Sequence, residues 1–238
     1  MCRVAISAAT GRLRPCRLAG CDDAAVIADL PMEPVLEVIG VFVGALSGAL
    51  AGVRKQFDVF GILALGWAAG LGGGLLRDVL IGAVPPVGIS DWRLVATALV
   101  GGLAMYFFHP RLERARRSIV LLDAGALALF TVVGAIKGLE HGTTLIAAIF
   151  VGVLTGVGGG VLRDLLTGEV PVVLHHRQLY AIPALLGASA IAVLWKLDLA
   201  TTGAAVTVVV GIFALRVVAL RFQVEAPGPW PGLRRGRG

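Results

Sequence analysis

Long apolar runs set the strongest limit on how this chain can fold. A window of about 20 predominantly apolar residues can cross roughly 30 Å of hydrocarbon as an α-helix. Of the 238 residues 57% are hydrophobic and only 15% charged, whereas a soluble domain is about 45–50% apolar and about 25% charged. The sequence therefore predicts an all-α transmembrane protein whose seven spans cover about 35–53, 58–81, 92–108, 118–138, 143–166, 178–195 and 200–221.

The two ends of the chain differ from this apolar body. Residues 1–34 mix arginines with acidic residues and hold no apolar run of signal-peptide length, and Met32 offers a second candidate start. Residues 222–238 are rich in proline, glycine and arginine. Such compositions cannot bury a core, so both ends are predicted to be disordered tails.

Basic residues collect in the segments that alternate spans place on one side of the membrane. By the positive-inside rule this side is cytoplasmic, so we expect a plasma-membrane protein with its N-terminus outside and its C-terminus inside. The net charge of +6 comes from basic residues next to the spans, so we expect the protein to bind anionic lipid and not nucleic acid. These basic residues are Arg54, Lys55, Arg111, Arg114, Arg116, Arg117, Arg177, Arg221, Arg234, Arg235 and Arg237.

One phrase occurs twice in the chain. GGGLLRDVLIGAVP occupies 72–85 and GGGVLRDLLTGEVP occupies 158–171, 86 residues later, and the two agree at ten of fourteen positions. The match extends over three spans, which predicts one repeat at 35–117, a second at 118–199 and a seventh helix at 200–221. Because three is odd, the second repeat must enter the membrane upside down relative to the first.

The glycine triplets lie near the middle of their spans. Each glycine costs about 1 kcal/mol relative to alanine inside a helix, so Gly72, Gly73 and Gly74, and likewise Gly158, Gly159 and Gly160, predict helix breaks that free backbone groups for an ion or a substrate. The alternative is that small residues only let helices approach closely. That alternative is favoured for the more widely spaced Gly44, Gly48, Gly52, Gly66 and Gly70.

Charged pairs follow the triplets. Arg77 and Asp78, and Arg163 and Asp164, are predicted to open a new half-helix, pointing about 100° apart so that neither is the natural partner of its neighbour. Two roles stay open, a structural ion pair or interfacial anchor and a place on the transport pathway. Pro85 and Pro171 are predicted to end these half-helices.

Three further charged residues lie near the ends of predicted spans. Glu37 and Asp123 occupy equivalent places near the start of the first span of each repeat, where we expect them at the membrane interface. Lys137 lies near the end of a span and is expected to extend its amine to the interface.

The duplicated GGGxxRDxLxGxxP in two three-span repeats resembles the bacterial relatives of the trimeric intracellular cation channels, a set also described as a glycine transporter domain family. The resemblance covers about residues 35–220. It implies a homotrimer with one K⁺- and Na⁺-conducting pore per protomer. The second and fifth spans would be kinked at the triplets, and Arg77, Asp78, Arg163 and Asp164 would flank the path.

Three functional readings follow. A monovalent cation channel would use carbonyls freed at the triplets. A secondary transporter for glycine or another small amino acid would hold the carboxylate at a half-helix start and the ammonium on freed carbonyls. A lipid-binding or purely structural membrane protein is the third. No nucleophilic triad, nucleotide loop or metal cluster is evident, so no enzyme activity, cofactor or bound metal is expected.

Overall fold

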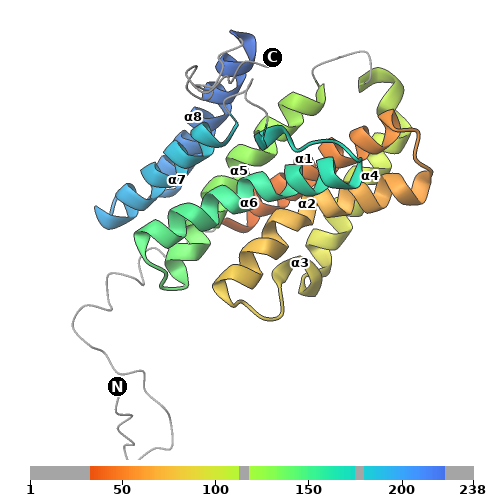
Figure 1. Ribbon diagram of the computed structural model, residues 1–238. Coiled ribbons are helices and arrows are strands. Elements are labelled where there is room, and N and C mark those ends of the chain that lie inside the picture. Colours follow the sequence, from red (N-terminus) through yellow and green to blue (C-terminus); the bar gives the residue numbers. More distant parts are fainter. Residues whose placement is uncertain (1–32, 113–117, 175–179, 223–238) are drawn as a thin grey trace, which may run out of the picture.

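The computed structural model describes residues 33–112, 118–174 and 180–222, and helices make up nearly all of these segments (Figure 1). Seven long helices match the seven predicted spans, which confirms the fold class. The elements are α1 (Glu33–Arg54), α2 (Val59–Ile81), α3 (Val87–Ser90), α4 (Trp92–Leu112), α5 (Ser118–Glu140), α6 (Leu145–Leu166), the 3₁₀ helix η2 (Val172–Leu174), α7 (Ala181–Lys196) and α8 (Thr202–Arg221).

Small differences from the expected bounds occur at the edges. Helix α1 already begins at Glu33, inside the predicted tail. The four-residue α3 lies in the connection between α2 and α4 and was not predicted. Five helices, α1, α2, α5, α6 and α8, are long and apolar enough to cross a membrane, and α7 is apolar but shorter. The remainder of both tails, the arginines at 114–117 and Arg177 lie outside the described residues.

The helix ends repeat at the same interval as the sequence. Asp58 caps α2 by accepting a hydrogen bond from the amide of Gly61 at 2.7 Å, and Thr144 caps α6 in the equivalent place. At the other end, Gly82 and Gly168 adopt φ of 73° and 72°, which only glycine tolerates easily. The prediction that Pro85 and Pro171 end these helices is therefore wrong, because each helix stops at its glycine turn before the chain reaches the proline.

The helices form two units that meet in the centre. Helices α1, α2 and α4 pack together, as do α5, α6 and α7, and the units join through contacts of α2 with α6 and of α1 with α5. Helix α8 has no equivalent in the first unit and lies against α5 and α7, to one side of the bundle in Figure 1. This placement brings the α8 side chains to the edge of the second unit only.

Widely spaced glycines bring helices into backbone contact within each unit. A Cβ at Gly66 would approach the Ala45 carbonyl to 3.2 Å, and at the equivalent Gly152 it would approach that of Thr131 to 2.8 Å. A Cβ at Gly70 would stand 2.8 Å from the carbonyl oxygen of Val41. A side chain would be crowded at Gly66 and would push the helices apart at Gly70, so the packing role predicted for these two glycines is confirmed.

Candidate functional site

Helices α2 and α6 cross at the two glycine triplets. A Cβ on Gly73 would collide with the carbonyl oxygen of Thr155, and one on Gly159 with that of Ala69. Thr155 follows Ala69 by 86 residues, and Gly159 follows Gly73 by the same interval, so the two contacts are equivalent. From the first contact to the second, the residue number falls from 73 to 69 on α2 and rises from 155 to 159 on α6, so the two helices run antiparallel. The crossing therefore lies on the pseudo-two-fold axis that relates the inverted repeats.

The triplets do not break their helices. Helix α2 is continuous from Val59 to Ile81 and α6 from Leu145 to Leu166, so the predicted interruption at Gly72, Gly73 and Gly74, and at Gly158, Gly159 and Gly160, is wrong. The physical reason is the crossing itself. Contact with a second backbone is available only to a helix surface without side chains, and a continuous helix keeps its own hydrogen bonds while making it.

The Arg77 cluster lies near the C-terminal end of α2 and consists of Arg77, Asp78, Glu37 and Lys137. The Arg77 Nε donates to Asp78 Oδ1 at 2.8 Å, and its Nη1 lies 3.0 Å from Glu37 Oε1. Lys137 Nζ reaches Glu37 Oε2 at 2.7 Å. Arg77 and Asp78 are fully enclosed. Two cations thus meet two carboxylates inside the protein.

The Arg163 cluster stands at the corresponding end of α6 and consists of Arg163, Asp164, Asp123 and Ser47. The guanidinium donates from Nε and Nη2 to Asp164 Oδ1, at 2.9 and 2.8 Å. Its Nη1 donates to Asp123 Oδ1 and to the Ser47 hydroxyl, both at 2.8 Å. Because α2 and α6 are antiparallel, the two clusters lie on opposite sides of the glycine crossing.

Each aspartate of the repeated phrase also holds the following connection. Asp78 Oδ2 accepts from the Val87 amide at 2.8 Å, and Asp164 Oδ2 from the Val172 amide at 2.9 Å. The expectation that these charges open a half-helix is wrong, because they occupy the last turns of continuous helices. The expectation that neighbours do not pair is also wrong, since the long arginine side chain folds back onto the adjacent carboxylate.

Residues outside the phrase complete both clusters. Glu37 and Asp123 are each only 7% exposed, so their side chains are buried inside the bundle, and their expected place at the membrane interface stays a prediction. Lys137 is bound to Glu37 rather than extended to the interface. The signal was available in the repeat, because an acid stands at the same position of the first span in both copies. Nothing in the linear pattern pointed to Ser47.

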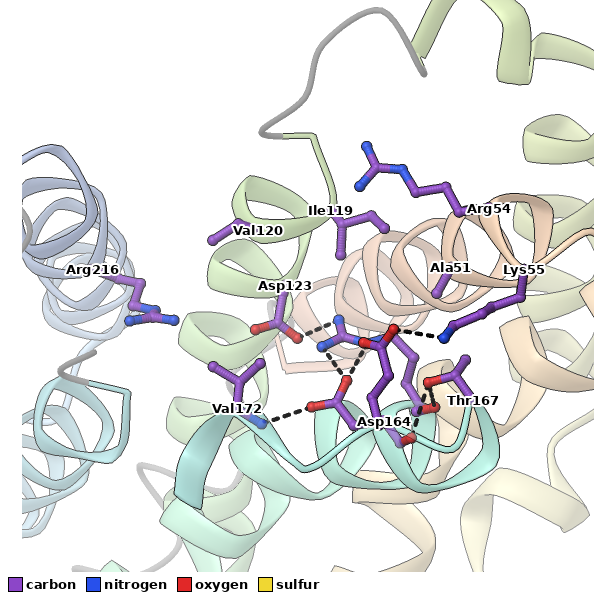
Figure 2. Close-up of a pocket in the computed structure, with 12 residues that line it drawn as sticks. Ala51, Arg54, Lys55, Ile119, Val120, Asp123, Asp164, Thr167, Val172 and Arg216 are labelled. Carbon is purple, nitrogen blue, oxygen red and sulfur yellow. Dashed lines mark hydrogen bonds and ion pairs between the residues drawn. The ribbon is translucent and has the colours of Figure 1, made fainter. Parts of the chain in front are cut away.

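A cavity of about 260 Å³ opens onto the Arg163 cluster (Figure 2). Lys55 and Glu169 form an ion pair of 2.8 Å on its wall, which places the connections after α1 and after α6 on the same side of the molecule. This agrees with the predicted alternation of spans. Its lining residues are Ala51, Arg54, Lys55, Ile119, Val120, Asp123, Arg163, Asp164, Thr167, Glu169, Val172 and Arg216.

Two buried residues that sequence reasoning missed stand beside this cavity. Tyr180, next to the start of α7, donates a hydrogen bond to Asp123. The guanidinium of Arg216 lies over the Tyr180 ring, 4.7 Å from its centroid. The one signal for Arg216 was a lone arginine in the last apolar run.

Between the cavity and the glycine crossing lies a void of about 10 Å³. Arg163 and Asp123 border it on the cavity side, and Phe130, Gly44 and Gly159 form other parts of its wall. A space of about 10–15 Å³ holds one water molecule, so this void has no room for a hydrated ion in this conformation. Within the described residues no group of three or more potential metal-ligating side chains is present.

Comparisons with known proteins agree with this architecture. The profile of the glycine transporter family matches the chain twice, over residues 34–110 and 120–196. A UPF0126 membrane protein of Deinococcus radiodurans is 46% identical over 157 residues, which cover 66% of this chain and 73% of the relative. A UPF0126 membrane protein of Streptomyces coelicolor is 40% identical over 195 residues, covering 82% and 89%.

Solved structures show the same fold. The TRIC trimeric intracellular cation channel orthologue from Rhodobacter sphaeroides is 34% identical, with a TM-score of 0.77 over 81% of this chain and 99% of that chain. A structure described as the basis for conductance through TRIC cation channels is 30% identical, with a TM-score of 0.75 over 83% and 97%. These relatives are described as membrane proteins and channels, not as enzymes.

A bundle of apolar helices, built as two inverted three-helix repeats with charged clusters buried inside, defines a multi-pass membrane protein with the fold of the TRIC channels. The two profile matches fall on the two repeats. The chain belongs to the glycine transporter family, together with the UPF0126 membrane proteins.

Proposed function

We propose that this protein is a homotrimeric channel for K⁺ and Na⁺ in the plasma membrane, with one pore in each protomer. The observation that carries the proposal is the likeness, at 34% identity over nearly the full length of the solved chain, to a trimeric cation channel. The N-terminus would lie outside and the C-terminus in the cytoplasm. The cavity beside Lys55 would then be the cytoplasmic entrance.

The pore we propose passes beside the glycine crossing rather than through a break in it. A cation would enter the 260 Å³ cavity and meet the carboxylates of Asp123 and Asp164. It would then pass Arg163 and the small void bordered by Phe130. On the far side of the crossing the Arg77 cluster would flank the path in the equivalent place. The cavity wall holds three carboxylates and four basic side chains, so we propose that the cation is drawn by direct contact with the carboxylates rather than by a net negative charge of the cavity.

Opening requires Arg163 to move. Its guanidinium joins α6 to α5 through Asp123 and to α1 through Ser47. While these bonds hold, the void behind it has room for a single water molecule. Release of Arg163 from Ser47 and Asp123 would connect the void with the cavity, and we therefore propose this pair of bonds as part of the gate.

The glycine triplets have a structural role in this proposal. They let α2 and α6 approach to backbone contact at the pseudo-two-fold axis. The carbonyls of residues 72–74 and 158–160 lie inside continuous helices, where they accept the regular helical hydrogen bonds. These carbonyls are thus not free to replace the hydration shell of an ion. They are equally not free to bind the ammonium group of a glycine substrate.

The bilayer is the other partner that we propose. Arg54 and Lys55 lie at one end of the bundle under the proposed orientation, next to the lipid headgroups. Basic side chains near the membrane surface attract anionic lipid by about 1 kcal/mol each. We expect this attraction to hold the protein in register with the cytoplasmic leaflet.

Single-channel recording of the purified protein in a planar bilayer tests the channel proposal. We expect stepwise currents whose reversal potential follows an imposed K⁺ gradient, and a particle mass in solution of three chains of 24.6 kDa. Silent bilayers together with saturable glycine counterflow in liposomes would contradict the channel and favour a carrier instead.

A further inference from the structure

The two buried clusters obtain their second cation from different places. Around Glu37 and Asp78, the balancing charges are Arg77 and Lys137, all within the two repeats. Around Asp123 and Asp164, the phrase supplies only Arg163. With that residue alone, the second cluster would carry one uncompensated negative charge in a largely buried site.

The repeat explains where the missing cation should have been. Glu37 on α1 is equivalent to Asp123 on α5, and Lys137 on α5 is equivalent, at the same interval of 86, to Ala51 on α1. Lys137 binds Glu37 in the first cluster, so a lysine at 51 would bind Asp123 in the second. Instead Ala51 lines the 260 Å³ cavity, which occupies part of the space that a longer side chain would take.

A residue from outside the repeats lies in the same cavity. Arg216 belongs to α8, the helix without a counterpart, and is only 1% exposed. Figure 2 shows its side chain reaching from α8 toward Asp123. Tyr180 connects the two, since its ring lies under the guanidinium and its hydroxyl donates to Asp123. The ring fixes the position of the charge without neutralising it.

We propose that Arg216 supplies the charge that Ala51 leaves out, and that it thereby sets how strongly the cavity attracts cations. Resting on the channel function proposed above, this makes Arg216 a conductance-determining residue contributed by the seventh span. With Arg216 in place the two carboxylates are balanced by two cations. Without it, the cavity loses one positive charge next to Asp123, which makes it more attractive to cations.

The test compares Arg216→Gln with the wild type by single-channel recording in KCl. At about 0.01 M salt, where the screening length is about 30 Å, we expect the variant to conduct K⁺ about 1.6 times as well, the effect of one elementary charge acting through water across roughly 10 Å. At about 1 M salt, where the screening length falls to roughly 3 Å, the difference should disappear. Arg216→Lys keeps the charge and should conduct like the wild type.

Arg221→Gln is the matched control. It removes the same charge from the same helix, but its side chain is exposed and does not line the cavity. A conductance that is unchanged or lower in Arg216→Gln, or raised equally in Arg221→Gln, would overturn the inference. Failure of this inference leaves the cation currents of the wild type in place. The absence of currents from the wild type would instead overturn the proposed channel function.

A second variant covers the case in which Arg216→Gln does not assemble. Ala51→Lys combined with Arg216→Gln restores two cations to the cluster, this time from the repeat position. We expect the double variant to assemble as the wild type does and to return the conductance at low salt to the wild-type value. A double variant that neither assembles nor reverses the effect of Arg216→Gln would show that Arg216 does not act through this charge.

Discussion

The repeated arginine acts as a connector between helices. Arg163 donates to groups from three helices, namely Asp164 on α6, Asp123 on α5 and Ser47 on α1. Arg77 binds the adjacent aspartate in the same way and reaches Glu37 on α1. Removing one member of a buried ion pair costs about 3–5 kcal/mol because its partner is left uncompensated. Conversely, a guanidinium whose three nitrogens each lie against a carboxylate can remain inside an apolar bundle.

The last glycine of each triplet allows a matched test at this scale. A methyl group on Gly160 would stand 2.6 Å from the Tyr180 hydroxyl and 3.0 Å from Asp123 Oδ1, whereas one on Gly74 would have only the Arg77 Nη2 within 4 Å, at 3.8 Å. We expect Gly160→Ala to displace Tyr180 and lower stability by about 1–3 kcal/mol. Gly74→Ala should be neutral or stabilising by up to about 1 kcal/mol, because alanine favours the helix.

Thermal unfolding of the two variants in detergent, followed by tryptophan fluorescence, measures this difference. Equal melting temperatures for Gly160→Ala and Gly74→Ala would contradict the assigned contact between Gly160 and the Tyr180 hydroxyl.

At the scale of elements, the antiparallel crossing of α2 and α6 is the centre of the molecule. Glycine at 73 and 159 puts each backbone against a carbonyl of the other helix, and the two repeats share this contact equally. Without a hydrophobic driving force between helices in lipid, close packing of this kind is a main source of helix association. The costs that glycine imposes on each helix are offset by the contact that it permits.

Gly73→Ala tests the crossing against Gly72→Ala. The new methyl at 73 would meet the backbone oxygen of Thr155, which can yield only if the helices separate. At 72 it would meet the terminal methyl of Leu162, a flexible side-chain end. We expect Gly73→Ala to lose about 2–3 kcal/mol, with reduced recovery of assembled protein.

Gly72→Ala should keep its assembly, as measured by size-exclusion chromatography in detergent. Normal assembly and melting of Gly73→Ala would show that the helices do not meet where the structure places them.

At the scale of the whole molecule, the inverted repeats produce two ends with different properties. The end with Lys55 and Glu169 has the 260 Å³ cavity, and its cluster takes a cation from α8. The equivalent cluster at the other end takes its cation from α5 through Lys137. The channel that we propose would thereby have two unlike ends, since the main contacts of α8 are with the second half.

The orientation of these ends can be measured by labelling. Single cysteines at Lys55 and at His141, in a background in which Cys2, Cys16 and Cys21 are replaced, would report on opposite faces. Both positions are exposed in the structure. We expect a membrane-impermeant maleimide to label Lys55→Cys only in inside-out vesicles and His141→Cys only in intact cells, because basic connections stay in the cytoplasm. The reverse pattern would place the cavity outside.

By itself, the sequence determined the number and order of the spans, the repeat and its inversion. These follow from apolar length, from an interval of 86 and from an odd count of crossings, all of which are linear properties. The triplets and the Arg-Asp pairs were found from sequence as the unusual positions, but their roles were not. Whether glycines break a helix or admit a second one depends on what lies opposite, and that is a matter of three dimensions.

Only the tertiary structure decided which charges meet. Glu37 and Lys137 are 100 residues apart, and Arg163 and Ser47 are 116 apart. Arg216 lies outside the repeats, so no equivalent residue could predict its position. A buried charge is stable only with its partner in contact, and the partners come from helices that packing, rather than pattern, brings together. The glycine crossing sets that packing, and so the chemistry of both clusters follows from it.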